Sequence, residues 1–454
     1  MSKTTDLFLE RPTHVRWQIL ALLLAFSFMN WLNRTSIAVA YDLRIQEQYR
    51  ISELDMGYVY SALFLAYTLF MTPGGWVADR RGARATLLFV GFGSALFAVA
   101  TGLLGTVAHT LGFAADQIWV CLLFIRFGMG TCMAPIYPAS GRAVGHWIPS
   151  HGRASANGLI TGAALLGIAS NFLILGKLID WFDWPVALMI CGLVTALVTL
   201  LWALWARDRP EQHPRVNKAE LRLMADETSV SAPADKAAAA PVDNPSADSW
   251  RALLRNRSLL FLTVSYAAVG YFEYLFFFWI HRYFVKVLLL GENASRYYSC
   301  IVMLAMAGGM VIGGRLSDVL QRSYGRRYAR LCVAAGGMLA GAALLFCGLR
   351  SSTPVWIVAW FSLALAAVGA SEGPFWTTAI ELGGRRSGTA CGIFNTGGNI
   401  GGVLAPSVTP FVFANLPLAW DVIFRWKVAI SLGAVVCILG AALWWKIDPN
   451  TETK

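Results

Sequence analysis

The chain has 454 residues, of which 57% are hydrophobic and only 14% are charged. Soluble domains carry about 25% charged residues, so this composition excludes an ordinary water-soluble enzyme or binding protein. The formal net charge is +11. Because basic residues at the ends of apolar runs set membrane topology, we attribute this excess to orientation in a membrane and expect no nucleic-acid partner.

Apolar runs of about 20 residues recur along the chain, and each is long enough to cross a bilayer as a helix. Backbone groups in lipid must be hydrogen-bonded within the segment, so the runs predict an all-α membrane protein. We expect twelve spans, near residues 17–40, 56–78, 85–108, 116–143, 154–178, 184–206, 257–282, 297–317, 328–349, 354–380, 388–413 and 424–446.

Basic residues are concentrated in every second loop. By the positive-inside rule these loops and both termini are predicted to be cytoplasmic. The segment before the first span is polar and has no cleavable signal pattern. The basic loops carry Arg80, Arg81, Arg84, Arg142, Arg153, Arg322, Arg326, Arg327, Arg330, Arg385 and Arg386; the opposite loops carry fewer, among them Arg44, Arg50, Lys286 and Arg296.

A polar, Ala/Pro-rich stretch at 207–250 interrupts the apolar pattern. This composition predicts a cytoplasmic linker with one amphipathic helix near 217–226, followed by disorder. It divides the chain into an N-terminal bundle of six spans, 1–206, and a C-terminal bundle of six spans, 251–454.

The two halves repeat each other. The segment GGWVADRRGAR follows the second span and GGRLSDVLQRSYGRR follows the eighth, which places Asp79 and Asp318 at an offset of 239 residues. Pro135 and Pro374 are separated by the same offset. A shared offset at two separate landmarks indicates a duplicated six-helix unit.

Four further segments are distinctive: NWLNR (30–34), MGYVYSALFLAYTLFMTPGGW (56–76), RFGMGTCMAPIYPA (126–139) and GIFNTGGNIGGVLAP (392–406). Together with the repeat, they resemble the major facilitator superfamily (MFS) and, within it, the anion:cation symporter family of galactonate, hexuronate, glucarate and phthalate transporters. The resemblance implies an MFS fold with two pseudo-symmetric six-helix bundles, placed in a bacterial inner membrane.

Four ionisable residues lie within predicted spans: Arg34, Arg126, Glu273 and Glu372. Each costs at least ~2.5 kcal/mol in mid-membrane, so each indicates function. A guanidinium group offers a fork of donors that matches a carboxylate. The resemblance implies that Arg34 and Arg126 bind the substrate's carboxylate or support its site; the alternative is a salt bridge that only joins helices.

The resemblance also implies proton-carrying acids in the first and fourth spans, but this chain has Asn33 and Met133 there. The offset of 239 leads from Met133 to Glu372 and from Arg34 to Glu273. We therefore predict that the proton-coupling carboxylates lie in the C-terminal half and face the two arginines. A buried carboxylate takes up a proton readily; a static ion pair is the alternative.

Other polar residues are weaker candidates. The resemblance implies substrate contacts for Tyr67, Asn395 and Asn399. The alternative for Tyr67 is a hydrogen bond to a backbone carbonyl, and the alternative for the two asparagines is helix packing. Thr377, which follows Pro374, is predicted to line the site. His281, next to Arg282 at the outer end of the seventh span, is expected to be a solvated end residue, with a proton relay as the alternative. The aromatic run 271–279 is expected to pack in lipid or core, with a cavity wall as the alternative. A cytoplasmic latch like that of the superfamily is predicted from Asp79, Arg80, Gly82, Arg84 and Asp318.

The leading functional prediction is a secondary transporter that imports a small organic anion, a sugar acid, with protons. The alternatives are a uniporter or exchanger, an importer of an aromatic carboxylate, and a membrane ligand sensor. No metalloprotease, serine-hydrolase or nucleotide-binding motif is present, so an enzyme is not expected. The eight cysteines all fall in predicted spans, and we expect no cofactor, metal site or disulfide. The expected partners are the carboxylate, protons and the lipid bilayer, with the protein a monomer.

Overall fold

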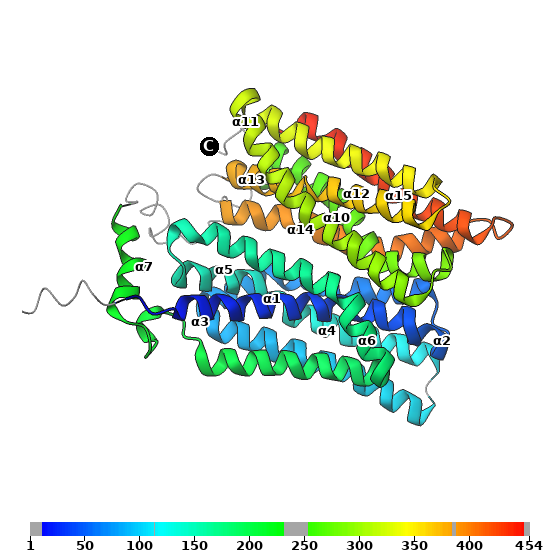
Figure 1. Ribbon diagram of the computed structural model, residues 1–454, viewed down its shortest axis with the longest axis horizontal. Coiled ribbons are helices and arrows are strands. Elements are labelled where there is room, and N and C mark those ends of the chain that lie inside the picture. Colours follow the sequence, from blue (N-terminus) through cyan, green and yellow to red (C-terminus); the bar gives the residue numbers. More distant parts are fainter. Residues whose placement is uncertain (1–10, 113, 231–252, 384–386, 449–454) are drawn as a thin grey trace, which may run out of the picture.

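The computed structural model describes residues 11–112, 114–230, 253–383 and 387–448, and within them it is helical, without strands (Figure 1). The long helices run along one axis. The helices of the N-terminal half, residues 11–206, lie below those of the C-terminal half, residues 253–448, in the view of Figure 1. We call the end where α1 begins the terminal end and the opposite end the distal end.

The helices have these bounds. The N-terminal half contains α1 (Val15–Ala40), a π-helical turn (Tyr41–Ile45), α2 (Gln46–Tyr49), α3 (Glu53–Leu111), α4 (Ala115–Met133), α5 (Ile136–Trp147) and α6 (Ser150–Trp205). The short helix Pro210–Gln212 and α7 (Lys218–Val230) follow. The C-terminal half contains α10 (Arg257–Arg282), a π-helical turn (Tyr283–Val287), α11 (Glu292–Arg350), α12 (Pro354–Gly369), α13 (Glu372–Gly383), α14 (Ser387–Asn415), α15 (Val422–Leu443) and the short helix Trp444–Lys446.

Three of these helices, α3, α6 and α11, each contain a sharp break. The backbone is non-helical at Gly82 (φ 84°), Asp183 (φ 63°) and Gly325 (φ 77°). A continuous helix of 59 residues, the length of α3 and of α11, would be about 90 Å long, roughly three times the hydrocarbon core of a bilayer. Each of the three therefore represents two membrane spans joined by a tight turn.

Counted in this way, all twelve predicted spans are present. Nine described stretches are long and apolar enough to cross a membrane. Two of them, Ala156–Trp205 and Glu292–Arg350, contain two spans each, and α14 supplies the remaining one. The interruptions within the fourth and tenth spans, before Ile136 and before Glu372, separate α4 from α5 and α12 from α13. The predicted twelve-helix architecture is confirmed.

The repeat is visible in the helix lengths, with two corrections. Helices α5 and α13 have 12 residues each and start 236 residues apart, so in this register the counterpart of Glu372 is Ile136 rather than Met133. Helices α3 and α11 have equal lengths, and their first residues, Glu53 and Glu292, are 239 positions apart in the sequence. Helices α1 and α10 also have equal lengths, but Val15 and Arg257 are 242 residues apart. In this register the counterpart of Arg34 is Phe276, and Glu273 lies nearly one helical turn away from that position.

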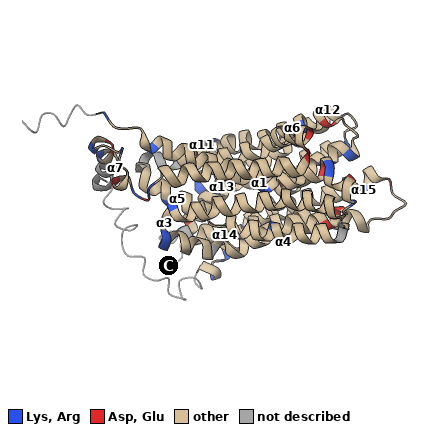
Figure 2. Cartoon of the chain, turned by 90° about the horizontal axis from the view of Figure 1, so that it is seen from below, with Lys and Arg blue, Asp and Glu red and all other residues tan. Residues whose placement is uncertain are grey.

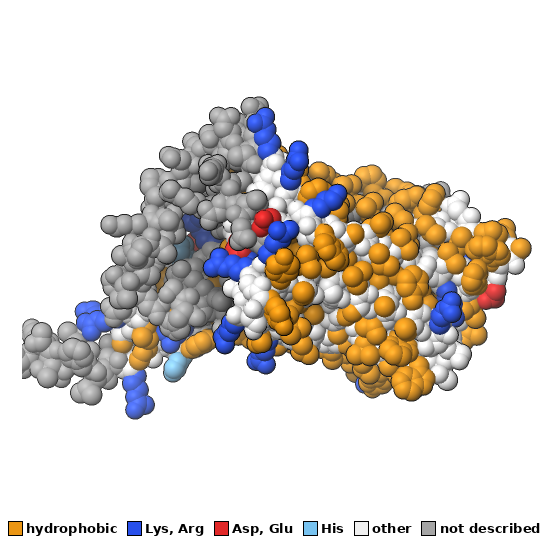
Figure 3. Space-filling view, turned by 90° about the horizontal axis from the view of Figure 1, so that it is seen from above, with side chains coloured by type: hydrophobic (Ala, Val, Ile, Leu, Met, Phe, Trp, Pro, Cys, Tyr) orange, Lys and Arg blue, Asp and Glu red, His pale blue; other side chains and the backbone are white. Residues whose placement is uncertain are grey.

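The distribution of side chains on the surface of the bundle matches a lipid environment. Charged residues gather toward the two ends of the bundle (Figure 2), and hydrophobic side chains cover most of its length (Figure 3). Large apolar residues such as Phe124 and Leu193 are more than 60% exposed, as expected where lipid replaces water. Polar residues inside the bundle consequently need an explanation of their own.

The first part of the linker is folded onto the terminal end of the N-terminal half. Glu220 on α7 is fully buried, and its carboxylate accepts hydrogen bonds from the Thr13 hydroxyl and from the backbone N–H of Arg16 (3.2 Å). An anion at the start of α1 is stabilised by the helix dipole. Helix α7 extends a few residues past the predicted 217–226, and the rest of the linker, 231–250, lies outside the described residues.

His213 joins the same region to the bundle. Its ring packs edge-on against Trp147 and Trp205, with centroids 5.8 Å and 5.3 Å away. Burial, with the nearby positive charges of Arg207 and Arg215, lowers the pKa of His213. We call the segment 206–224, with His213 and Glu220, the linker clasp.

Candidate functional site

Arg34 lies inside α1 with only 2% of its surface exposed. Its guanidinium carbon is 4.5 Å from the ring centre of Trp31, 4.3 Å from that of Phe64 and 4.3 Å from that of Tyr67. A desolvated cation over an aromatic face gains about 2 kcal/mol. We call these three rings the aromatic cage; it stabilises the positive charge without a carboxylate.

One edge of the Arg34 guanidinium is free. Among the described residues, its Nε and Nη2 atoms have no hydrogen-bond partner. These two nitrogens form the side-on edge that donates two parallel hydrogen bonds to one carboxylate. The geometry therefore provides a receptor for a single carboxylate group.

Asn30 adds a second polar group that the sequence analysis did not single out. It lies one turn before Arg34 on the same face of α1, at the i, i+4 spacing. It is 3% exposed, and neither its amide nitrogen nor its amide oxygen has a partner in the described part of the chain. In the sequence, the i, i+4 spacing between Asn30 and Arg34 is the feature that could have identified Asn30 as a site residue.

Arg126 has a different role from Arg34. It is also 2% exposed, but its Nη1 donates to the backbone carbonyl of Asn33 (3.0 Å) and its Nη2 to that of Arg34. These bonds join α4 to α1 directly behind the Arg34 side chain. The partner of Arg126 is therefore backbone carbonyl oxygen rather than a carboxylate, and Arg126 positions the helix that carries Arg34.

The two positions where the family resemblance implies acids, Asn33 and Met133, hold packing residues. The amide of Asn33 donates to the hydroxyl of Thr195 on α6 (2.8 Å), within the N-terminal half. Met133 is fully buried. Neither side chain can exchange a proton.

Glu273 on α10 and Glu372 at the start of α13 lie together in the C-terminal half, each 8% exposed. Their carboxyl groups lie close to each other. The Oε2 atom of Glu372 accepts from the Tyr266 hydroxyl (3.0 Å) and from the Trp376 indole (3.1 Å). Two ionised carboxylates side by side in a buried site repel each other, which favours a proton on one of them.

The expected direct contact between arginines and glutamates is not formed in this structure. Within the described residues, neither Arg34 nor Arg126 is in an ion pair. The reason is that the carboxyl pair is held by Tyr266 and Trp376 in its own half, while the cage holds Arg34 in the other.

Aromatic residues of α10 form the contact between the halves at this depth. Tyr274 packs against Phe64 (centroids 4.4 Å apart), and Phe277 packs against Trp31 (6.4 Å). The aromatic run 271–279 thus packs in the core between the halves and not in lipid.

The remaining predicted substrate residues are distributed differently. Tyr67 is part of the aromatic cage. The amides of Asn395 and Asn399 on α14 both reach the sulfur of Met71 on α3, at 3.7 Å and 3.8 Å, across the interface. The Thr377 hydroxyl donates to the carbonyl of Gly373 in its own helix (2.7 Å). No described contact joins Asn395, Asn399 or Thr377 to Arg34.

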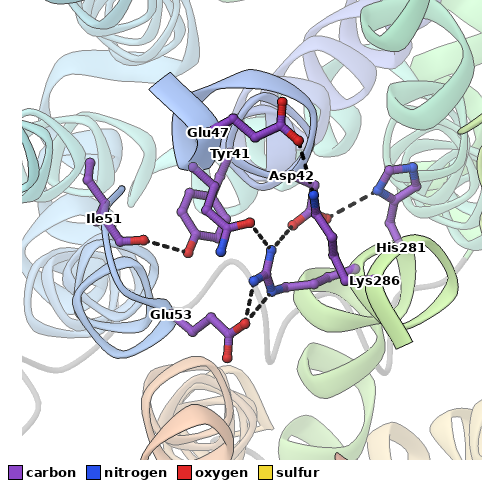
Figure 4. A network of polar contacts seen from close by, with 9 residues as sticks. Tyr41, Asp42, Glu47, Ile51, Glu53, His281 and Lys286 are labelled. Carbon is purple, nitrogen blue, oxygen red and sulfur yellow. Dashed lines mark hydrogen bonds and ion pairs between the residues drawn. The ribbon is translucent and has the colours of Figure 1, made fainter. Parts of the chain in front are cut away.

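At the distal end, a polar network connects the two halves (Figure 4). Arg282 donates from Nε to Glu53 (2.8 Å), and its Nη1 lies 3.7 Å from Asp42. The His281 ring lies 3.2 Å from the same Asp42. We call these four residues the distal gate; the salt bridge between Lys286 and Glu47 lies beside it at 3.2 Å.

The gate corrects one expectation. His281 is 1% exposed and Arg282 3% exposed, so neither is a solvated helix end. Each side chain reaches across the interface to an acidic residue of the N-terminal half. A buried ion pair offsets its desolvation cost only when the geometry of its hydrogen bonds is good. The hydrogen bonds and ion pairs that join described residues of the two halves run from this gate inward as far as Met71.

The predicted latch residues lie at the terminal end and make contacts within one half. The backbone N–H of Arg84 donates to Asp208 (2.8 Å), and a Cβ at Gly82 would lie 2.6 Å from the same carboxylate. Arg80 stacks on Trp76 at 4.0 Å. Asp318 is exposed, and the side chain of Asp79 lies outside the described residues.

In its described residues the chain has twelve apolar spans in two halves, buried arginines and glutamates inside them, and a polar network that joins the halves at the distal end. The chain belongs to the Major Facilitator Superfamily, whose family model matches residues 23–406. It is a transporter and not an enzyme.

Curated relatives carry sugar-acid names. The "Probable galactarate/D-glucarate transporter GudP" of Bacillus subtilis (strain 168) is 26% identical, and the alignment covers 88% of this chain and 86% of that protein. The "D-galactonate transporter" of Escherichia coli O6:H1 is 28% identical, with 94% and 96% covered.

Solved structures show the same fold at lower identity. A bacterial homologue of the human lysosomal transporter Spinster has a TM-score of 0.72 at 15% identity, with 96% of this chain and 97% of that chain covered. The D-xylose-proton symporter has a TM-score of 0.68 at 15% identity, with 96% and 99% covered.

Proposed function

We propose that this protein is a secondary active transporter that imports a small organic anion of the sugar-acid class together with a proton across a bacterial inner membrane. The observation that carries the proposal is the free edge of Arg34 in one half and the buried pair of carboxyl groups, Glu273 and Glu372, in the other. The relatives named for transport of galactarate, D-glucarate and D-galactonate support a sugar acid as substrate.

The buried charges suggest how the two fluxes are coupled. Two guanidinium groups and a carboxyl pair that holds one proton sum to a net charge of about +1, so this state attracts one anion. After the anion and the proton have both left, two ionised carboxylates balance two guanidinium groups. States with only one of the two cargoes leave a charge uncompensated in a low-dielectric interior, which is unfavourable.

The distal gate indicates which state of the transport cycle the structure represents. The positive-inside rule assigns the terminal end to the cytoplasm, so the gate closes the periplasmic side. The structure then corresponds to an inward-facing state, with both termini and the linker clasp in the cytoplasm. Transport would require the gate to open and the latch region at the terminal end to close.

Two observations favour related alternatives. Asn33 and Met133 replace the acids of proton-coupled relatives, which favours a uniporter or exchanger. The aromatic cage around Arg34 favours an aromatic carboxylate as substrate. Both alternatives are decided by the same assay.

The test is uptake into proteoliposomes with an imposed inward proton gradient, with labelled galactonate, galactarate, a hexuronate and benzoate as substrates. We expect the wild type to concentrate one hydroxylated acid, and Glu372→Gln and Glu273→Gln to equilibrate it without concentrating it. Glu292→Gln, a half-exposed residue with the same change, is the matched control and should behave as wild type.

Each other outcome has a definite meaning. Wild-type protein that only equilibrates substrate, whatever the gradient, is a facilitator or exchanger. Accumulation by both glutamate variants at wild-type levels would contradict the assignment of the carboxyl pair to proton coupling.

A further inference from the structure

We propose that the linker clasp is a cytoplasmic switch that responds to pH. While it is docked on the N-terminal half it permits import, and proton binding to His213 releases it and slows import. The role rests on the proposed function, because import of an acid with a proton acidifies the cytoplasm, and the positive-inside rule places the clasp on that side. The switch thus limits uptake when the cytoplasm becomes acidic.

The contacts of the His213 ring require it to be neutral when the clasp is docked. The ring is 5% exposed and lies between Trp147, at the end of α5, and Trp205, at the end of α6. Its Nδ1 atom accepts a hydrogen bond from the backbone N–H of Arg215 (3.2 Å). An imidazolium ring carries hydrogen on both nitrogens and can only donate. Binding of a second proton to the ring therefore breaks this bond.

The charges around the ring act mainly against the imidazolium form. Arg207 lies just after α6 and Arg215 two residues after His213. Burial of the ring is the first cause that lowers the pKa of His213, and these two positive charges add to it, while the carboxylate of Glu220 on α7 acts in the opposite direction. The geometry and the charges therefore agree that docking and protonation of His213 oppose each other.

A second histidine lies close to the clasp and is not expected to release it. The Nδ1 atom of His146 on α5 lies 3.0 Å from the backbone carbonyl oxygen of Asp208. A carbonyl oxygen only accepts, so this nitrogen carries the hydrogen. A second proton on the ring enters at the other nitrogen and leaves the bond in place. We therefore assign the pH response to His213.

The docked clasp caps the starts of two membrane spans. The second helix of α3 begins after the break at Gly82, and the backbone N–H of Arg84 in its first turn donates to the carboxylate of Asp208 (2.8 Å). Glu220 accepts from the backbone N–H of Arg16 (3.2 Å) at the start of α1. Each carboxylate is stabilised by the dipole of the helix that it caps. The clasp therefore joins the first span to the third.

These two caps connect the clasp to transport. The first span carries Arg34, and the turn at Gly82 and Arg84 belongs to the predicted latch, which has to meet the C-terminal half when the terminal end closes. His213 lies between Asp208 and Glu220 in the chain, so release of its ring loosens the segment that carries both carboxylates. Undocking then leaves both spans without their caps, and we expect closure of the terminal end to slow.

The size of the pH response follows from linkage between proton binding and docking. The docked ring excludes the proton, and the undocked ring binds it with the ordinary histidine pKa of about 6.5. The ratio of undocked to docked clasp then rises about tenfold from pH 7.5 to pH 5.5. Docking is thus favoured at the higher pH and is lost as pH falls.

Limited trypsin digestion of the purified full-length transporter measures docking directly. Arg215 and Lys218 are exposed basic residues within the clasp. We expect cleavage after these residues to be about tenfold faster at pH 5.5 than at pH 7.5, once a reference peptide corrects for the effect of pH on trypsin, because cleavage follows the undocked population. His213→Phe keeps a ring between the two indoles but binds no proton, and its cleavage should not change. The same pH response in His213→Phe as in the wild type would overturn the assignment.

Exchange of labelled D-galactonate in right-side-out membrane vesicles measures the effect on transport. The internal pH is set to 7.5 or 5.5 while the external pH stays at 7.5, so the wild type and His213→Phe experience the same gradient. At the acid interior we expect the wild-type rate to fall about threefold further than that of His213→Phe. Glu220→Gln weakens docking but keeps the histidine, and its rate should already be low at an internal pH of 7.5. An equal fall in the wild type and His213→Phe, or faster wild-type exchange at pH 5.5, would overturn the switch.

The two assays separate this inference from the proposed function. If exchange stands but His213→Phe behaves as the wild type in both assays, the switch fails and the transport function is unaffected. If no acid of the uptake panel is transported, the proposed function and the role of the clasp in import fail together, and trypsin digestion still decides whether His213 controls docking. A thermal melt of each variant shows that it is folded.

Discussion

The two halves of this transporter share a fold and a repeat, but the buried charges inside their first helices, Arg34 in α1 and Glu273 in α10, have opposite signs. The N-terminal half holds buried arginines, one shielded by aromatic rings and one bonded to helix carbonyls. The C-terminal half holds a buried pair of glutamates. The difference shows that a duplicated bundle can place a buried cation in one half and buried carboxyl groups in the other.

Separation has a physical advantage over a direct ion pair. A buried arginine–glutamate pair is costly to break once formed, by about 3–5 kcal/mol, and would hold the halves together in every cycle. Aromatic faces stabilise Arg34 less strongly, by about 2 kcal/mol. A substrate carboxylate can therefore compete for the guanidinium edge.

The largest expected effect concerns Arg34 and tests the comparison directly. Arg34→Lys keeps the charge but loses the planar, two-donor edge, so we expect substrate affinity to fall about 100-fold, or about 3 kcal/mol. Calorimetry measures it, and Arg50→Lys, an exposed residue, is the control. Wild-type affinity in Arg34→Lys would mean that the carboxylate binds elsewhere.

A smaller effect is expected at Arg126, which sharpens the distinction between receptor and positioning residue. Arg126→Lys replaces the planar guanidinium, whose two nitrogens donate to two carbonyls of α1, by a single ammonium nitrogen. We expect one of the two hydrogen bonds to be lost, at a cost of about 1.5 kcal/mol. Affinity should fall about tenfold for every carboxylate alike, with proton-driven accumulation retained. A change in the ranking of substrates would instead indicate direct contact with them.

The distal gate can be opened without touching the site. Arg282→Gln removes the cation shared by Glu53 and Asp42 and should destabilise the closed distal end by about 3 kcal/mol. A cysteine introduced at Ser407, which contacts Ser61 across the interface at 2.6 Å, should then react about tenfold faster with a membrane-impermeant maleimide. Arg44→Gln, whose partner Asp183 lies in the same half, is the matched control. Unchanged labelling in Arg282→Gln would show that the network does not hold the gate.

The smallest effect belongs to the linker clasp, which has a counterpart neither in the repeat nor in the described C-terminal half. The pKa of His213 is lowered in the folded protein, so the undocked segment binds a proton more readily than the docked one. As pH falls through about 6.5, the ordinary value, the clasp should lose stability. Protection factors for amide hydrogen exchange in 206–224, which correct for the intrinsic effect of pH, should be lower at pH 5.5 than at pH 7.5, and His213→Phe should abolish the difference. A pH difference of the same size in His213→Phe would assign the effect to another group.

Part of the site could be predicted from residue type alone. Buried arginines and glutamates in apolar spans are costly, so Arg34, Arg126, Glu273 and Glu372 stood out. Their roles could not be assigned in the same way, because a hydrogen bond from Arg126 to a carbonyl and a free edge on Arg34 leave no trace in sequence. Asn30 was missed for the same reason, since an unsatisfied amide is identified only by its surroundings.

The sequence by itself determined the twelve helices, the duplication and the identity of the buried charges, because hydrophobic length and the cost of charge in lipid act locally along the chain. The tertiary structure decided what each charge contacts. Distances between α1, α4, α10 and α13 depend on how helices far apart in sequence pack. That packing placed the carboxyl pair together, left one guanidinium edge free, and buried His281 and Arg282 in a gate, where the chain alone indicated only a solvated helix end.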